Sequence, residues 1–238
     1  MPGLDPSHDG LRIAQLSDLH VGLMTSTAKI RRAVHRANAE KPDLTVLTGD
    51  YMCYSPKFLG LLHELVRELE GPAVAVLGNH DYWTDGEGVR RVFEKCGIHV
   101  LRNQHTEMQF RHAPLDIVGI DDAVTAHADP MRAFRGVPHD RSRIVLTHVP
   151  SLADITATYG PSLILAGHTH GGHVNIPKIT AGIAARLGNR YLAGFYEVKG
   201  SLLYVNKGIG SAAVPIRAGA PSEVTLLTLR SDGRDQSI

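Results

Sequence analysis

The first hundred residues alternate short apolar runs with longer amphipathic runs, and this alternation limits the folds that are open to the chain. Short apolar runs are typical of buried strands, whereas longer amphipathic runs are typical of helices. Strands that alternate with helices form βαβ units, which build a largely parallel sheet. We therefore expect an α/β fold, with strands at residues 11–16, 43–48, 73–77 and 98–101 and helices at residues 25–39, 57–70 and 87–95.

The second half of the chain is richer in predicted strands. Residues 108–111 and 115–120 have the pattern of two adjoining strands, and a short helix is expected from Ser151 to about residue 158. No linker, repeat or low-complexity stretch divides the sequence, so we expect residues 1–238 to form a single domain. Further strands are expected at residues 143–147, 163–166, 202–205 and 223–229.

The stretch 167–173, Gly-His-Thr-His-Gly-Gly-His, follows the predicted strand 163–166 directly. A strand that stops in His-x-His between glycines places two imidazoles at the edge of a sheet. Glycine permits a sharp turn and the close approach of another group. This motif alone fits either a metal site or a pair of hydrogen-bonded histidines.

Other predicted strands also end in residues whose side chains can bind a metal ion. In parallel sheets, ligands bind beyond the carboxyl ends of the strands. Each motif taken alone is more typical of a turn, a helix cap or a structural histidine than of a metal ligand. Their recurrence at one edge of one sheet favours a shared metal site. The candidate residues are Asp18 with His20, Asp50, Asn79 with His80, His148, and His168 with His170.

The chemistry of these side chains limits the choice of ion. Carboxylates, one amide oxygen and several imidazoles form a mixed nitrogen and oxygen set, which suits Mn²⁺, Fe or Zn²⁺ better than Ca²⁺. The set contains no thiolate, so a structural zinc site is disfavoured. The ligands are too many for one ion and about enough for two.

Composition excludes several other classes of protein. The formal net charge is +1, so no global field attracts nucleic acid or an acidic membrane. Cys53 and Cys96 lie far apart without CxxC spacing, which indicates reduced thiols. The first ten residues lack the apolar core of a signal peptide, and no run approaches the roughly 20 apolar residues of a membrane span. We expect a cytoplasmic protein.

The order of the motifs, Asp-x-His, Gly-Asp, Gly-Asn-His-Asp, His and Gly-His-x-His, resembles the calcineurin-like metallophosphoesterase superfamily. The full Gly-His-Thr-His-Gly-Gly form and the Gly-Ile-Asp-Asp block at residues 119–122 resemble its small bacterial phosphodiesterase branch. This resemblance implies a four-layer α/β/β/α sandwich with a mixed, largely parallel sheet. It also implies a metal site at the carboxyl-terminal edge of the strands.

The resemblance assigns roles to individual residues. His80 would lie beside the substrate phosphate as an electrostatic stabiliser or general acid, and Asp81 would orient it. His80 would not bind metal. The first ion would be held by Asp18, His20 and His170, and the second by Asn79, His148 and His168, with Asp50 bridging both.

The reaction that the resemblance implies is metal-dependent hydrolysis of a phosphoester of the phosphodiester or pyrophosphate type. A hydroxide that bridges two divalent ions would attack phosphorus and break a P–O bond, which agrees with the general chemistry of paired metal ions. We expect Mn²⁺, with Fe, Zn²⁺ or Mg²⁺ as alternatives. No position of the family pattern is missing, which argues against a metal-free relative.

Several alternatives remain within and outside this chemistry. The chain could be specifically a pyrophosphatase of a lipid-linked nucleotide sugar, of the diacylglucosamine type. Hydrolysis of a cyclic nucleotide or a phosphoprotein uses the same site, and a non-catalytic metal-binding scaffold is the non-enzyme alternative. The expected partner is a small-molecule or lipid-linked phosphoester, and nucleic acid is not expected because the sequence shows no basic groove.

The residues that select the substrate are less clearly marked. Tyr82 and Trp83 follow the Asn-His-Asp motif and could stack on a base or cover a lipid or sugar, or could simply pack the loop. His173 could reach the substrate from the glycine turn or lie on the surface. Asp121 and Asp122 are expected to support the site or form a turn and not to bind metal.

Residues 176–196 mix apolar side chains with Lys178, Arg186 and Arg190. A basic and apolar surface segment could contact a membrane peripherally or grip a lipid-linked substrate. Three glycines weaken a continuous helix, so a loop packed over the core is the alternative.

Overall fold

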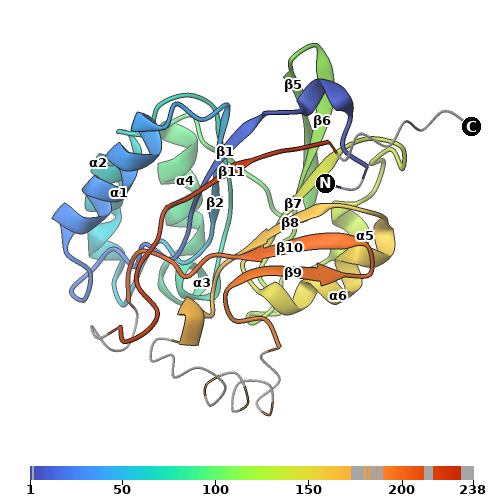
Figure 1. Ribbon diagram of the computed structural model, residues 1–238. Helices are drawn as coiled ribbons and strands as arrows, with labels where there is room; N and C mark the ends of the chain where they lie inside the picture. The colour runs from blue at the N-terminus through green and yellow to red at the C-terminus, as the bar shows by residue number, and fades with distance from the viewer. Residues whose placement is uncertain are drawn as a thin grey trace, which may run out of the picture.

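Two β-sheets face each other at the centre of the protein, and helices cover their outer faces (Figure 1). The structure is a computed structural model that describes residues 1, 3–172, 180, 182, 186, 190–211 and 217–231. The first sheet has the order β11-β1-β2-β3-β4 and the second the order β5-β6-β7-β8-β10-β9. The strands of the first sheet are β1 (Arg12–Leu16), β2 (Leu44–Thr48), β3 (Ala73–Val76), β4 (His99–Val100) and β11 (Thr225–Thr228). Those of the second are β5 (Gln104–Phe110), β6 (Ala113–Gly119), β7 (Arg143–Leu146), β8 (Leu163–Ala166), β9 (Gly194–Val198) and β10 (Ser201–Val205).

Most strand pairs among the described residues are parallel. Only β1 with β11, β5 with β6, and β9 with β10 pair in the antiparallel sense. The other pairs join β1–β2–β3–β4 in one sheet and β6–β7–β8–β10 in the other. The expected mixed, largely parallel arrangement is therefore confirmed. Parallel register places the carboxyl ends of neighbouring strands at one edge.

Helices form the two outer layers of the sandwich. The first sheet carries α1 (Thr27–Ala39), α2 (Leu59–Val66) and α4 (Gly86–Lys95), and the second carries α5 (Pro130–Ala133) and α6 (Ala153–Thr156). The predicted α/β/β/α order is thus observed. Among the described residues, no helix has the length and apolar composition needed to cross a membrane. The remaining short elements are α3 (Asn79–Thr84), η1 (Pro6–His8), η2 (Pro56–Phe58), η3 (Pro150–Leu152), η4 (Ala157–Tyr159) and η5 (His170–Gly172).

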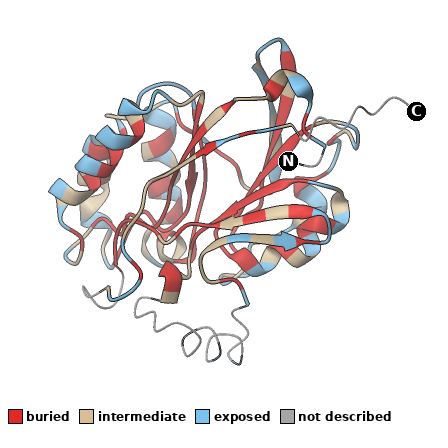
Figure 2. Ribbon diagram, viewed as in Figure 1, coloured by how far each residue is buried: buried red, intermediate tan, exposed pale blue. Residues whose placement is uncertain are grey.

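The core lies in three apolar layers (Figure 2), and successive residues of one strand enter different layers. In β3, Val74 and Val76 pack between the sheets, whereas Ala73 and Ala75 pack against the helices. Side chains alternate across a strand with a period of two, so a strand buried on both faces is apolar throughout. This is why these strands appear in the sequence as continuous apolar runs.

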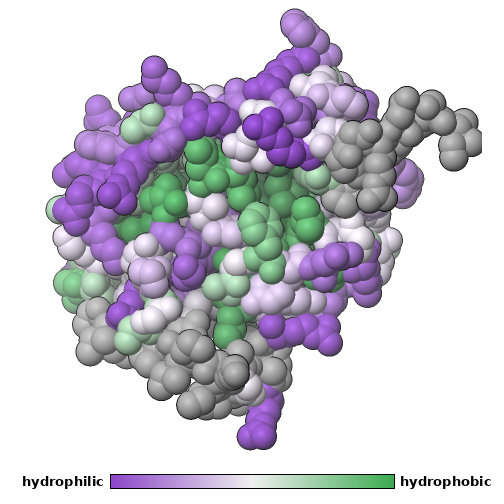
Figure 3. Space-filling view, viewed as in Figure 1, coloured by the Kyte–Doolittle hydropathy of each residue, from purple (hydrophilic) through white to green (hydrophobic). Residues whose placement is uncertain are grey.

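The core between the sheets reaches the surface beside β10. Figure 3 shows hydrophobic residues gathered over the middle of this face. Leu202 and Tyr204 of β10 are half-buried and pack on the core between the sheets. Phe195 of β9 is exposed and lies with its ring centroid 4.7 Å from that of Tyr204. Strand β9 pairs with β10 and therefore covers the outer edge of that strand.

Two local predictions differ from the structure. The predicted helix 57–70 starts as the 3₁₀ turn η2 and its α-helical part ends at Val66, before Gly71 and Pro72. Strand β9 starts at Gly194, in the last three residues of the segment 176–196, for which a packed loop was one of the two alternatives. Lys199 and Gly200 both have positive φ, as a two-residue hairpin turn requires, so the Lys-Gly pair was the available signal.

Candidate metal centre

The side chains predicted to bind metal meet at the carboxyl-terminal edge of both sheets, near α3 and η5 at the lower centre of Figure 1. They come from loops that follow β1, β2, β7 and β8 and from the first residue of α3. His168 is half-buried, and the other six are buried. The set is Asp18, His20, Asp50, Asn79, His148, His168 and His170.

One group of donors surrounds His170. Its Nε2 lies 3.3 Å from Asp18 Oδ1 and 3.1 Å from His20 Nε2. His20 Nε2 also lies 3.7 Å from Asp50 Oδ2. Metal–ligand bonds of about 2.0–2.2 Å place neighbouring ligand atoms roughly 3–4 Å apart. These separations fit one ion between the four side chains.

A second group of donors surrounds His148. Its Nε2 lies 3.2 Å from Asp50 Oδ2 and 3.1 Å from His168 Nδ1. Asn79 Oδ1 is buried and has no hydrogen-bond partner among the described residues. A buried oxygen without a partner costs about 1–3 kcal/mol, and a metal ion would satisfy it. Asp50 Oδ2 lies near both groups, 3.7 Å from His20 Nε2 and 3.2 Å from His148 Nε2.

The backbone at five of these candidate ligands is strained. Non-glycine residues rarely adopt positive φ, and such conformations cost about 1–3 kcal/mol each and cluster at functional sites. The surrounding structure must therefore enforce this geometry. The candidate ligands with positive φ are Asp18 (52°), His20 (47°), Asp50 (59°), His168 (73°) and His170 (52°).

Glycines next to the ligands allow very close approach. A Cβ atom at Gly167 would lie 2.0 Å from Ser17 Oγ and 2.5 Å from Asp18 Oδ2. A Cβ atom at Gly78 would lie 2.3 Å from Asp50 Oδ1. No side chain fits at these distances, so the Gly-His-x-His and Gly-Asn-His-Asp motifs require glycine for packing among the ligands.

The electrostatic state of the site suits cations. Burial opposes the charge on Asp50, but the neighbouring imidazoles of His148 and His20 outweigh it and hold the pKa of Asp50 well below its ordinary value. Burial lowers the pKa of His20 to about 3. The pKa of His148 is raised to about 10, because Asp50 outweighs the opposing effect of burial. Binding of a metal ion to His148 would displace the proton from this imidazole.

Further groups orient the ligands. His148 Nδ1 donates to the Thr48 carbonyl at 2.7 Å, which directs Nε2 toward the centre. Ser17 Oγ donates to Asp18 Oδ2 at 2.6 Å. Arg217 donates to His170 Nδ1 at 2.8 Å and also to backbone carbonyls, including that of Lys207 at 2.7 Å. These supporting residues were not predicted from the sequence, and Arg217 lies in no motif that could have indicated it.

Asp81 has contacts that differ from the predicted one. Both of its carboxylate oxygens accept backbone N–H groups, from Asp50 at 3.0 Å, Tyr51 at 2.8 Å, Met52 at 3.0 Å and Gly78 at 2.9 Å. Burial raises the pKa of Asp81, while these donors stabilise its charged form. We infer that Asp81 positions the loop that carries Asp50 and not the imidazole of His80.

Replacing Asp81 with alanine is expected to lower the free energy of unfolding by about 3–5 kcal/mol, because four buried N–H groups would lose their acceptor. Urea denaturation measures this change. Asp85→Ala is the matched control, because Asp85 accepts from one backbone amide, Gly88 N, and its loss should cost only about 1 kcal/mol. Equal costs for the two variants would contradict the inference.

The predicted substrate residues separate into two kinds. The Tyr82 hydroxyl donates to Asp121 at 2.6 Å, and its ring stacks on His127 at 4.0 Å, as the loop-packing alternative expects. Trp83 is 63% exposed, and its ring centroid lies 4.9 Å from that of His80. Asp122 accepts from the backbone N–H of Thr125 at 2.6 Å, which fits a turn.

Two predictions fall on parts of the chain that the structure does not describe. His173 lies outside the described residues. So do most of residues 176–196, of which only 180, 182, 186 and 190–196 are described. The contribution of this segment to substrate or membrane binding therefore stays a prediction.

An α/β/β/α sandwich with buried carboxylate, amide and imidazole side chains at its strand ends presents donors that can bind metal ions. The sequence profile described as calcineurin-like phosphoesterase matches residues 11–172. The chain belongs to this family, and it is a metal-dependent phosphoester hydrolase.

Relatives span nearly the whole chain. The uncharacterised metallophosphoesterase YkuE of Bacillus subtilis is 30% identical over 94% of this chain and 80% of its own. The phosphodiesterase YaeI of Escherichia coli is 30% identical over 92% and 82%. The UDP-2,3-diacylglucosamine pyrophosphatase LpxG of Chlamydia muridarum is 26% identical over 92% and 83%. The crystal structure of TT1561 from Thermus thermophilus shares the fold, with a TM-score of 0.58 at 14% identity over 83% of this chain and 89% of its own.

Proposed function

We propose that this protein hydrolyses phosphodiester or pyrophosphate bonds with two divalent ions held side by side. The observation that carries this proposal is the position of Asp50 Oδ2, 3.7 Å from His20 Nε2 and 3.2 Å from His148 Nε2. One carboxylate oxygen that faces two donor groups is suited to bridging two cations. The buried and unpartnered Asn79 Oδ1 supports the second position.

The metal ions and His80 would have different roles in the reaction. When bound, two divalent ions would lower the pKa of water and neutralise charge on the phosphate. His80 lies at the edge of the centre, with its ring centroid 4.9 Å from those of His20 and Trp83. From there, its imidazole would stabilise the developing charge or give a proton to the leaving oxygen.

Hydrolysis of defined substrates by the Mn²⁺-loaded protein tests this proposal. We expect turnover of aryl phosphodiesters or nucleotide pyrophosphates, loss of turnover with a chelator, and recovery when Mn²⁺ returns. Fe, Zn²⁺ and Mg²⁺ are compared in the same assay, because Mn²⁺ is itself part of the proposal. A protein that binds two ions and cleaves no phosphoester would support the scaffold alternative.

A lipid-linked pyrophosphate is a narrower candidate substrate, and one feature of the site favours it. Leu23, Tyr54 and Trp83 are 76%, 61% and 63% exposed. Val21 pairs with Met52, which brings the loop that carries Leu23 to the loop that carries Tyr54. An apolar rim beside a phosphate site suits a substrate with an apolar substituent. The relative LpxG is named as a pyrophosphatase of a diacylated substrate, UDP-2,3-diacylglucosamine. Cytoplasmic location with peripheral membrane contact belongs to the same proposal.

Trp83→Ala is expected to raise KM for a diacyl pyrophosphate substrate about tenfold while leaving KM for a small aryl phosphodiester within about twofold. The change removes apolar contact area and no metal ligand. Met131→Ala is the matched control, because Met131 is 70% exposed on α5, away from the rim. A parallel rise in both KM values would argue against an apolar subsite.

A further inference from the structure

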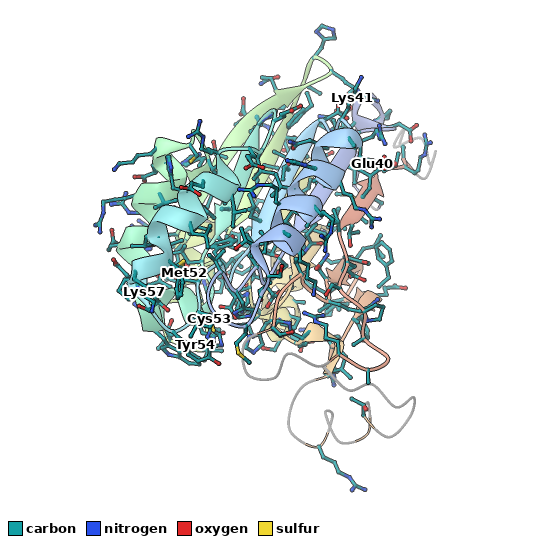
Figure 4. All side chains as sticks on the ribbon, turned by 90° about the vertical axis from the view of Figure 1, so that its left-hand side faces the viewer. Glu40, Lys41, Met52, Cys53, Tyr54 and Lys57 are labelled. Carbon is teal, nitrogen blue, oxygen red and sulfur yellow. The ribbon has the colours of Figure 1, made fainter. Side chains whose placement is uncertain are left out.

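Cys53 is the one thiol that lies at the edge of the metal centre in the described part of the chain. Its Sγ and one ring nitrogen each of His20 and His80 lie within 4.8 Å of one another. Cys53 is fully buried, three residues after Asp50. Figure 4 shows Cys53 between Met52 and Tyr54 at one end of the helical layer, opposite Glu40 and Lys41.

The loop that carries Cys53 is held rigidly in place. Its backbone N–H donates to the Val21 carbonyl at 3.2 Å, and the preceding N–H of Met52 donates to Asp81 at 3.0 Å. A Cβ atom at Gly22 would lie 2.9 Å from the Cys53 carbonyl oxygen, so the two loops are in close contact. The thiol is therefore presented to the histidines by fixed backbone and not by a mobile segment.

A second observation at this place also points to a ligand. His20 is fully buried, and its Nδ1 has no hydrogen-bond partner among the described residues. A buried nitrogen without a partner is costly, and metal coordination is one way to satisfy it. The His20 and His80 rings meet edge to face at 4.9 Å, which leaves both imidazoles beside the thiol.

We propose that Cys53, His80 and His20 form a third metal site, which binds a thiophilic divalent ion such as Zn²⁺ or Cd²⁺ and inhibits the enzyme. Thiolate ligands select such ions over Mn²⁺ or Mg²⁺, which prefer oxygen. Metal–sulfur bonds are about 2.3 Å long and metal–nitrogen bonds about 2.0 Å. Donor atoms that lie 4.8 Å apart would therefore have to move about 1 Å closer to one another to bind one ion. On binding, a metal–sulfur bond replaces the S–H bond, the proton passes to solvent, and no group is oxidised.

Inhibition follows from the residues that the two sites share. An ion at the third site binds His20 Nδ1, on the same imidazole whose Nε2 belongs to the donor group around His170, and it therefore repels a cation held there. It also takes His80 from the position beside the phosphate. The first ion and the thiophilic ion therefore compete, and this consequence rests on the proposed function. Binding of the thiophilic ion itself does not depend on that function.

Titration of the Mn²⁺-loaded protein with Cd²⁺ tests the site. We expect an ultraviolet thiolate-to-cadmium charge-transfer band that saturates at one ion per chain, together with loss of activity. Cys53→Ser should lose the band, and its inhibition midpoint, measured against its own cadmium-free rate, should rise about tenfold or more. Cys96→Ser is the matched control, because Cys96 follows α4 and packs against the core. It should keep both the band and the inhibition.

The outcomes separate this inference from the proposed function. A band that persists in Cys53→Ser, or equal inhibition of the wild type and that variant, overturns the third site. A Cys53-dependent band in a protein that hydrolyses no phosphoester keeps the site and removes the proposed function. Cys53→Ala, checked for folding by thermal denaturation, repeats the experiment without a hydroxyl that could bind metal weakly.

Discussion

Asp50→Asn is expected to remove bound metal and phosphoester hydrolysis together. Asp50 Oδ2 lies 3.7 Å from His20 Nε2 and 3.2 Å from His148 Nε2, so one substitution weakens both donor groups. The amide also lacks the negative charge that offsets two cations. Because loss of a group that merely supports a ligand costs about 10–100-fold, loss of a shared ligand should lower kcat/KM by at least about a hundredfold.

Elemental analysis and hydrolysis rates of the same protein sample measure this effect. Asp116→Asn is the matched control, because Asp116 is also a buried carboxylate. Asp116 pairs in register with Arg143, the first residue of β7. It therefore lies toward the amino-terminal end of this strand, away from the metal centre at the carboxyl-terminal ends. The control should keep its full metal content. An Asp50→Asn protein that retains two ions would show that Asp50 does not bridge them.

His80→Ala is expected to keep both ions and to lose turnover by about 10²–10⁴-fold. Its backbone N–H donates to Asp50 Oδ1 at 2.9 Å and is unchanged by the substitution. The His80 imidazole belongs to neither of the two donor groups. Its ring contacts those of His20 and Trp83. The effect should therefore appear in kcat and not in metal content.

Metal analysis and steady-state kinetics on the same preparation separate the two roles of His80. His127→Ala is a suitable control, because His127 stacks on Tyr82 and lies outside both donor groups. Loss of one ion from His80→Ala would move His80 into the ligand set. An unchanged kcat would remove it from the reaction.

The arrangement of the candidate ligands could be predicted because strand topology determines it. Asp18, Asp50 and His148 lie far apart in the sequence, but each follows a buried strand of a largely parallel fold. Apolar periodicity identifies such strands, and the parallel register then brings their carboxyl ends to one edge. The role of Arg217 could not be predicted in this way, because a residue in an irregular loop has no periodic position.

Contacts made by a side chain were harder to predict than its location. Asp81 and Tyr82 were both expected near the site, and both lie there. Asp81 accepts four backbone amides, however, and Tyr82 donates to Asp121, a residue 39 positions away. Such pairings depend on loop geometry, which sequence patterns do not specify. The position of Cys53 beside the site could not be predicted for the same reason.

Electron paramagnetic resonance of the Mn²⁺-loaded protein tests the central claim, that Asp50 joins two ions in one centre. Elemental analysis of the same sample gives the number of ions per chain. The predicted result is two Mn²⁺ per chain with the spectrum of an exchange-coupled pair, and loss of that spectrum in Asp50→Asn. One ion per chain, or two ions with the spectrum of isolated Mn²⁺, would contradict a dinuclear centre.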